Sequence, residues 1–128
     1  DIDHFKYVND NHGHAVGDQV LCQFASLLRA HVRATDWVGR RGGEEFLIVL
    51  PGTDAEQART VALVLQERVN ADHFACIGRV SASFGVTQYQ RGEALAELLE
   101  RGDRALYKAK SNGRDRIEMG MPEGALVS

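Results

Sequence analysis

Acidic side chains occur at two places in the chain that a folded sheet could bring together. Asp1 and Asp3 open the sequence, and Glu44 and Glu45 follow a Gly-Gly pair. Hard divalent cations such as Mg²⁺ prefer carboxylate and carbonyl oxygens and usually keep waters that substrate phosphates can replace. Two or three carboxylates on neighbouring strands are therefore enough for a cation that neutralises phosphate charge and activates an attacking hydroxyl. Solvated surface charge is the alternative explanation for each pair by itself.

A hairpin is predicted to carry the second acidic pair. Residues 37–41 can be extended, and the apolar run 46–50 is ended by Pro51. Gly42 and Gly43 suit a two-residue turn between them, because both central residues of such a turn take positive φ. Successive strand residues point to opposite faces, so only one of Glu44 and Glu45 can face any given site.

Basic and amide side chains elsewhere suit a phosphate and a base. Lys110 and Arg114 are four residues apart at the end of the last expected helix, where both could reach one phosphate group. Cations at this end of a helix also complement its dipole, which is the structural alternative. Asn9 and Asp18 flank a glycine-containing turn, and a carboxylate with an amide can hydrogen-bond the edge of guanine. Turn former and helix N-cap are the alternative roles of these two residues.

The histidines and cysteines do not predict a metal site. His4, His12 and His14 lack the helical or cysteine-paired spacing of zinc sites. Cys22 and Cys76 form no C-x-x-C motif and lie in apolar surroundings, so we expect buried, reduced thiols.

The composition is that of one domain. The 128 residues are 44% hydrophobic and 26% charged, which is enough apolar material for a core. The net charge of −3 argues against a surface that coats nucleic acid or an anionic membrane. No apolar run is long enough to cross a bilayer. Because the sequence opens on Asp1 without a methionine or a lead-in, we expect a fragment of a longer protein.

Helical and extended segments alternate along the chain. Four helices are predicted. The first covers residues 5–9, and the second begins at residues 17–18 with Asp18 as its N-cap. The third follows the capping box at residues 53–56, and the fourth covers residues 93–110 and ends before the stop signal Asn112-Gly113. Helical spacing predicts three buried faces: Val20, Leu21, Phe24, Leu27, Leu28 and Val32; Val61, Val64, Leu65 and Val69; and Leu95, Leu98, Leu99, Leu106 and Ala109. Further strands are expected within residues 76–89 and 114–118, and the tail after 120 has little to bury. This order favours an α+β domain with a mainly antiparallel sheet and helices packed on it.

Five sequence blocks occur in an order typical of one protein family. They are D-I-D-H-F-K, N-D-N-H-G-H-A-V-G-D, G-G-E-E-F, S-A-S-F-G-V and D-R-A-L-Y-K-A-K-S-N-G-R. Together they resemble the GGDEF domain of diguanylate cyclases, from Asp1 to about Ile117. Each block is modest evidence by itself, whereas five blocks in order are highly specific. In this family G-G-E-E-F is as compatible with activity as G-G-D-E-F.

The resemblance implies a fold, a reaction and partners. The fold would be the palm-like α/β (α+β) fold of nucleotidyl cyclases over residues 1–118, followed by a tail at 119–128. The enzyme would condense two GTP molecules into cyclic di-GMP and release two pyrophosphates, each 3′-hydroxyl attacking the α-phosphate of the other GTP. Each subunit would hold one GTP, so an antiparallel homodimer is implied, with Mg²⁺ or Mn²⁺ as cofactor. A cytoplasmic domain is implied, attached to an N-terminal sensory or regulatory domain whose membrane anchoring the sequence leaves open, with no nucleic-acid partner.

The resemblance also assigns residues by matching positions. Asp1 and Glu44, helped by the Ile2 carbonyl, match the metal ligands, and Glu45 matches a second acidic residue that binds metal or activates the 3′-hydroxyl. The resemblance implies that the backbone amides of His4, Phe5 and Lys6 contact the GTP phosphates and that Lys6, Lys110 and Arg114 add positive charge there. It implies that Asn9 and Asp18 bind guanine. Gly42 and Gly43 match positions where a side chain would obstruct the nucleotide. The R-x-x-D formed by Arg33 and Asp36 matches an inhibitory site for cyclic di-GMP, with Arg68 as its second arginine.

Three other functions stay open. A catalytically silent domain would bind GTP or cyclic di-GMP and regulate an attached module, although intact Asp1, Glu44, Lys110 and Arg114 argue against such decay. A dimerising scaffold without a nucleotide is disfavoured by the R-x-x-D and the hairpin signature together. A cyclase with a mixed or different purine product is not excluded by Asn9 and Asp18 alone.

Overall fold

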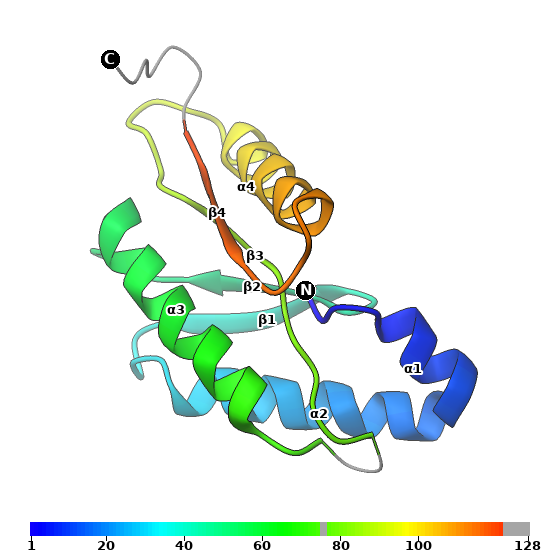
Figure 1. The fold of residues 1–128 in the computed structure, drawn as a ribbon. Coiled ribbons are helices and arrows are strands. Elements are labelled where there is room, and N and C mark those ends of the chain that lie inside the picture. The colour runs from blue at the N-terminus through cyan, green and yellow to red at the C-terminus, as the bar shows by residue number, and fades with distance from the viewer. Residues whose placement is uncertain (75–76, 122–128) are drawn as a thin grey trace.

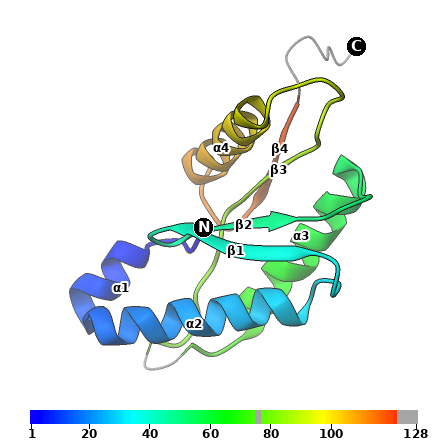
Figure 2. The same ribbon diagram turned by 180° about the vertical axis from the view of Figure 1, so that it is seen from behind.

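The computed structural model describes residues 1–74 and 77–121, which form four helices and four strands (Figure 1). In chain order these are α1 (Phe5–His12), α2 (His14–Ala30), β1 (Trp37–Gly42), β2 (Glu45–Val49), α3 (Ala55–Ala71), β3 (Phe84–Thr87), α4 (Leu95–Ser111) and β4 (Ile117–Gly120). In both views α1 and α2 lie on one side of the β1–β2 hairpin, and α4 with β3 and β4 lies on the other (Figures 1 and 2). The N-terminus lies beside the hairpin, so the first acidic residues come close to the second pair.

The α+β class is confirmed, but the described strands do not form one mainly antiparallel sheet. β1 and β2 pair antiparallel, whereas β3 and β4 form a separate parallel pair. The parallel pair arises because α4 connects its two strands, and a helical crossover returns the chain in the same direction. Outside the named strands, Ile2 forms a single antiparallel bridge with Ala82.

The inner face of α2 supplies much of the core, as its helical spacing predicts. Val20, Leu21, Phe24, Leu27 and Leu28 are buried. The Phe24 ring packs against Phe46 of β2 with 5.1 Å between ring centroids. The sixth predicted member, Val32, lies beyond the end of α2 and is half-buried against the core. Burial of this stripe fixes α2 beneath the hairpin.

Three helix starts differ from their predicted positions, and α4 begins at Leu95 and not at residue 93. α2 begins at His14 after Gly13, so Asp18 lies inside the helix and is not its N-cap. The capping box of α3 is formed by Asp54 and Gln57, one residue later than the predicted frame. The Asp54 carboxylate accepts from the Gln57 amide at 2.8 Å, and the Gln57 side chain accepts from the Asp54 amide at 3.0 Å. Aspartate and threonine are both good N-cap residues, so residue type alone does not show whether Thr53 or Asp54 is the N-cap.

Several burial predictions are wrong. Val64 is 40% exposed, because the inward stripe of α3 is Ala62, Leu65 and Val69. Leu95 is 67% exposed, and α4 buries Arg101, Ala105 and Ala109. The predicted leucine face of α4 borders a cavity of about 790 Å³ between the two sheets, which leaves those leucines partly accessible. Cys22 is exposed, and Cys76 lies outside the described residues.

The last strand begins later than predicted. β4 begins at Ile117 because Arg114 and Asp115 have φ of 63° and 46°, which no strand accommodates. The predicted helix stop at Asn112-Gly113 is confirmed, since Asn112 caps α4 and Gly113 has a φ of 122°. β4 extends to Gly120, and residues 122–128 of the predicted tail lie outside the described part.

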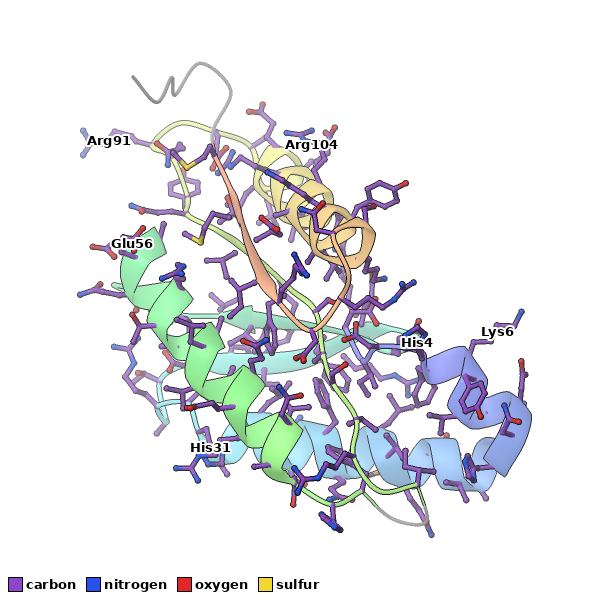
Figure 3. All side chains as sticks on the ribbon, in the orientation of Figure 1. His4, Lys6, His31, Glu56, Arg91 and Arg104 are labelled. Carbon is purple, nitrogen blue, oxygen red and sulfur yellow. The ribbon has the colours of Figure 1, made fainter. Side chains whose placement is uncertain are left out.

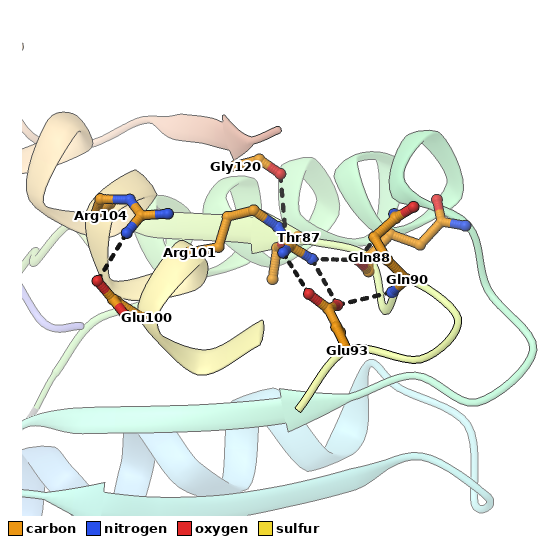
Figure 4. Close-up of polar contacts among 8 residues, drawn as sticks. All are labelled: Thr87, Gln88, Gln90, Glu93, Glu100, Arg101, Arg104 and Gly120. Atoms are coloured by element: carbon orange, nitrogen blue, oxygen red, sulfur yellow. Dashed lines mark hydrogen bonds and ion pairs between the residues drawn. The ribbon is translucent and has the colours of Figure 1, made fainter. Parts of the chain in front are cut away.

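A buried ion pair that the sequence patterns did not indicate fixes the start of α4 (Figure 4). The side chains of Arg101 and Glu93 are 6% and 8% exposed, and Arg101 Nη1 lies 2.7 Å from Glu93 Oε2. Arg101 also donates to the Thr87 hydroxyl at 2.8 Å and to the Gln88 carbonyl at 2.6 Å. These contacts join the end of β3 to α4. The hydrogen bonds from Arg101 lower the pKa of Glu93 to about 2.

Candidate functional site

Asp1 is a buried carboxylate with unused hydrogen-bonding capacity. Its side chain is 1% exposed and forms an ion pair with the ammonium of Lys110 from α4. Neither carboxylate oxygen accepts a hydrogen bond from the described residues. Buried carboxylates ordinarily accept several hydrogen bonds, because burying them without partners is costly. Oδ1 thus has no partner among the described residues and Oδ2 has only the Lys110 ammonium, which leaves room for a ligand, and the donor type fits a hard cation.

The hairpin turn places Glu44 and Glu45 beside Asp1. The Ile2 amide donates to the Glu44 carbonyl at 3.4 Å, which attaches the turn to the N-terminal segment. Glu45 and Asp1 both line the cavity of about 790 Å³. The cavity lining is otherwise mainly apolar and does not suit a triphosphate, so the polar groups around Asp1 define the candidate site.

The hairpin turn differs from the predicted one by one residue. Gly42 pairs with Glu45 after a register shift, so Gly43 and Glu44 form the turn in place of Gly42 and Gly43. Gly43 has a φ of 51°, and the Arg40 guanidinium donates to its carbonyl at 2.7 Å. A Cβ at Gly42 or Gly43 would meet nothing within 4 Å, so the space over the turn is open.

Among residues 1–74 and 77–121, no three histidine, cysteine, aspartate or glutamate side chains are grouped so that they could hold a metal ion together. Mg²⁺, however, is commonly bound through one or two carboxylates, with waters and substrate phosphates completing its coordination. Asp1 with one glutamate of the hairpin meets that requirement. Among the described residues, His4, His12 and His14 belong to no such group.

The start of α1 presents backbone amides. His4, the N-cap, is left-handed with φ 56° and ψ 32°, and its side chain makes no capping hydrogen bond. The first amides of a helix have no intrahelical acceptor and carry its positive dipole end, which suits an anion. Lys6 projects away from α1 into solvent (Figure 3).

α1 and α2 bring Asn9 next to Gly17 and Asp18. Asn9 Oδ1 is buried and has no hydrogen-bond partner among the described residues. A Cβ at Gly17 would lie 1.9 Å from Asn9 Oδ1, so the Asn9 side-chain amide can take this position only because residue 17 is glycine. Asp18 follows on the exposed side of α2. Gly17 is a candidate site residue that the sequence reasoning missed, and glycine inside a helical pattern was its signal.

Asp3 differs from Asp1 because both oxygens of its carboxylate accept hydrogen bonds. It accepts from the hydroxyls of Ser81 and Ser83, both at 2.6 Å, and from the Asp115 amide at 3.0 Å. Asp115 follows Arg114, so Asp3 contacts the turn that carries a predicted phosphate ligand. Lys110 and Arg114 lie on the two sides of the α4 C-cap at Asn112.

Arg33 and Asp36 form a closed pair in the turn before β1. Arg33 Nη2 lies 2.8 Å from Asp36 Oδ1, and its guanidinium also donates to the Pro51 carbonyl at 2.8 Å and the Thr53 hydroxyl at 3.0 Å. The hydrogen bonds from Arg33 hold the pKa of Asp36 below its ordinary value. Both residues line a cavity of about 390 Å³ together with Gln57.

Arg68 is not brought to this cavity. It lies eleven residues after Gln57 on α3, which is about 16 Å along a helix axis. It is exposed and does not line the cavity, so the described structure does not join it to Arg33.

The comparisons with known proteins identify the family to which the chain belongs. Residues 1–116 match the family model described as the diguanylate cyclase, GGDEF domain. The chain is 43% identical over 122 residues to diguanylate cyclase DgcP of Pseudomonas aeruginosa, covering 93% of this chain and 18% of that protein. It superimposes on the active GGEEF domain of a diguanylate cyclase from Vibrio cholerae with a TM-score of 0.85 and 37% identity, covering 96% of this chain and 80% of that one. It also superimposes on the GGDEF domain of DgcB from Caulobacter crescentus, which was solved in complex with c-di-GMP. The TM-score is 0.88 with 32% identity, and the match covers 94% of this chain and 74% of that one.

The fold and the site define a nucleotidyl-cyclase-like α+β domain with paired carboxylates beside a glycine hairpin. The chain belongs to the GGDEF domain family of diguanylate cyclases. It spans 18% and 28% of the length of two curated relatives, which are correspondingly longer proteins. In the described part of the chain, no helix is long and apolar enough to cross a membrane.

Proposed function

We propose that this chain is the catalytic domain of a diguanylate cyclase, which condenses two GTP molecules into cyclic di-GMP and releases two pyrophosphates. The observation that carries the proposal is the buried Asp1 carboxylate, which accepts no hydrogen bond from the described residues and lies beside Lys110 and the Glu44–Glu45 hairpin. The membership of the GGDEF family supports the same reaction.

The metal site is proposed to comprise Asp1, Glu44 and the Ile2 carbonyl, with Glu45 close by. Two carboxylates with a carbonyl and substrate phosphates are a usual donor set for Mg²⁺, and Mn²⁺ accepts the same oxygens. When bound, the cation neutralises phosphate charge and polarises the α-phosphate. Glu45, which lines the same cavity as Asp1, is the proposed acceptor of the proton from the 3′-hydroxyl.

The remaining site residues are proposed to bind GTP. The amides of His4, Phe5 and Lys6 would hold the β- and γ-phosphates at the start of α1, with the cations of Lys6, Lys110 and Arg114 adding charge. Asn9 and Asp18 would hydrogen-bond guanine, which presents N–H donors that suit the unpartnered Asn9 Oδ1. The open space over Gly42 and Gly43 leaves room for the nucleotide.

The chemistry requires two subunits. Each 3′-oxygen forms a bond to the α-phosphorus of the other GTP, while the bond from that phosphorus to the β-phosphate bridge breaks and pyrophosphate leaves. One chain offers one set of the proposed GTP ligands, so two chains in an antiparallel homodimer would supply both. The proposal includes a cytoplasmic location, because GTP is an intracellular nucleotide. It also includes an N-terminal sensory or regulatory domain in the parent protein and no nucleic-acid partner.

Product feedback is part of the proposal. The related DgcB domain was solved with c-di-GMP, and the R-x-x-D of Arg33 and Asp36 is the proposed place for that ligand here. Arginine forms forked hydrogen bonds with phosphate and with the guanine edge. Because Arg33 already bonds to Asp36 and Thr53, the product would have to open this pair on binding. Arg68 stays a proposed partner that only a second chain or a rearrangement would bring close.

The domain is proposed to comprise residues 1–118, with a tail at 119–128. The family match ends at residue 116, and β4 continues to Gly120. The first residues of the tail would therefore complete the last strand.

The test is to incubate the protein with GTP and Mg²⁺ and separate the nucleotides by anion-exchange chromatography. Cyclic di-GMP with pyrophosphate is expected from the wild type, and none from Glu44→Gln, which keeps the shape but removes the charge. Glu67→Gln on the exposed side of α3 is the matched control and should match the wild type. Undiminished product from Glu44→Gln would refute the metal assignment. GTP binding without product from the wild-type dimer would favour a silent regulatory domain.

A further inference from the structure

The turn between α4 and β4 contains two consecutive non-glycine residues in the left-handed region. Arg114 has a φ of 63° and Asp115 a φ of 46°. Residues with a Cβ rarely adopt this region, and it persists where surrounding contacts over-determine the backbone. The turn must therefore be held by its neighbours.

Asp115 is held from two sides. Its amide donates to Asp3 Oδ2 at 3.0 Å. Its carbonyl accepts from the Gln66 side chain of α3 at 2.6 Å, and its carboxylate accepts from Asn70 at 3.0 Å. The Arg114 amide donates to the Ala109 carbonyl at 2.9 Å. The N-terminal segment, α3 and α4 thus converge on this turn.

Asp3 is the anchor from the side of the candidate site. The residue is 6% exposed, and its carboxylate also accepts from the hydroxyls of Ser81 and Ser83 at 2.6 Å. Its own amide donates to the Ser81 carbonyl at 3.0 Å. Hydrogen bonds to a carboxylate are short and strong, and a buried acceptor fixed at both backbone and side chain defines the position of its donor closely.

We propose that Asp3 is a positioning residue, which holds the Asp115 amide and thereby sets the left-handed turn that presents Arg114 to the triphosphate. The inference rests on the proposed function, because the phosphate role of Arg114 belongs to that proposal. The two aspartates of one tripeptide then act on the two sides of one turn: Asp1 pairs with Lys110 before it, and Asp3 bonds to Asp115 within it.

Asp3→Asn tests the inference, because it keeps the side-chain shape while replacing an acceptor oxygen with a donor amide. Hydrogen exchange of residues 112–116 should become faster. The KM for GTP should rise about tenfold in Asp3→Asn and in Arg114→Ala, the scale of one lost hydrogen bond. If Asp3 acts through Arg114, the double variant should be no worse than Arg114→Ala alone. Asp54→Asn, which alters another carboxylate that accepts a backbone amide, is the matched control and should leave the KM unchanged.

A rescue experiment separates positioning from a general structural role. Glycine adopts the left-handed region freely, so Asp115→Gly should recover most of the affinity lost in Asp3→Asn. Circular dichroism of each variant checks that it is folded, and Ser83→Ala, which removes one hydrogen bond from Asp3, replaces Asp3→Asn if that variant unfolds.

Three results would overturn the inference: unchanged exchange in residues 112–116, losses that multiply in the double variant, or no recovery with Asp115→Gly. With an active wild type, any of them removes this inference and leaves the proposed function intact. A wild type without cyclase activity would remove the proposed function and this inference together.

Discussion

Replacing Gly17 by alanine should weaken GTP binding without weakening the fold. An ideal Cβ at residue 17 would lie 1.9 Å from Asn9 Oδ1 and 3.3 Å from the Phe5 ring, whereas ordinary contact begins at 3.4 Å. The Asn9 amide would have to move by about 1.5 Å, which is enough to break a hydrogen bond to guanine. The loss of one such bond, with a buried partner left unsatisfied, costs about 1–3 kcal/mol. The Kd for GTP should therefore rise about tenfold or more.

The effect on stability should have the opposite sign or be small. Alanine is more favourable than glycine inside a helix by about 1 kcal/mol, which offsets the cost of shifting the Asn9 side chain, whose Cγ would lie 3.0 Å from the new Cβ. Isothermal titration with GTP and a urea titration of the same samples measure the two quantities separately. Gly102→Ala in α4 is the matched control, because its Cβ would meet only Thr87 Cγ2 at 3.6 Å. That variant should gain stability and keep its GTP affinity. A folded Gly17→Ala protein that binds GTP as tightly as the wild type would show that Asn9 does not read the nucleotide.

Two further predictions concern regulation and pH. Arg33→Ala should relieve inhibition by cyclic di-GMP while sparing the reaction, because Arg33 and Asp36 lie apart from the Asp1 site; an unchanged inhibition constant would remove Arg33 from that role. The Arg101 hydrogen bonds lower the pKa of Glu93 from 4.5 to about 2, so the ionised Glu93 stabilises the fold above pH 4.5 and this contribution is lost as the pH falls towards 2. Glu93→Gln should thus be less stable than the wild type at pH 7 in urea titrations, and the difference should shrink below pH 4.5. A difference that does not depend on pH would contradict this explanation.

Elements with strong local patterns could be predicted from the sequence. The stripe from Val20 to Leu28 lies on one helical face and is buried, because the periodicity of an amphipathic helix is a local property. The helix stop at Asn112-Gly113 is also local, since Gly113 takes a φ of 122°. The start of α2 was harder to place, because Gly13 separates two helices and Asp18 looks like a cap although the helix has already begun.

Features that depend on three-dimensional packing and backbone geometry could not be predicted from residue patterns. The parallel pairing of β3 and β4 follows from the path of α4, which no strand pattern reveals. The hairpin turn is formed by Gly43 and Glu44, and not by Gly42 and Gly43, because the strand register shifts after Arg40. The Gly-Gly pair does not by itself show which two residues form the turn. An arginine inside a helix is ordinarily expected to be exposed, but Arg101 is buried because it contacts Glu93 and Thr87. The β3–β4 pairing joins residues far apart in the chain, whereas the hairpin frame and the Arg101–Glu93 pair depend on local geometry that residue types alone leave open.

In the candidate site as well, the residue types could be read from the sequence, whereas the hydrogen-bond partners of each side chain could not be predicted. Asp1 and Asp3 have the same residue type and similar burial, and the sequence offered both as possible metal ligands. The structure separates them by their donors: Asp3 accepts three hydrogen bonds, whereas Asp1 accepts none from the described residues and has Lys110 as its charge partner. A saturated carboxylate is stable where it lies and suits positioning. An unsaturated carboxylate such as Asp1, in which Oδ1 has no partner among the described residues, can accept a ligand, and this is the property that binding a cation requires.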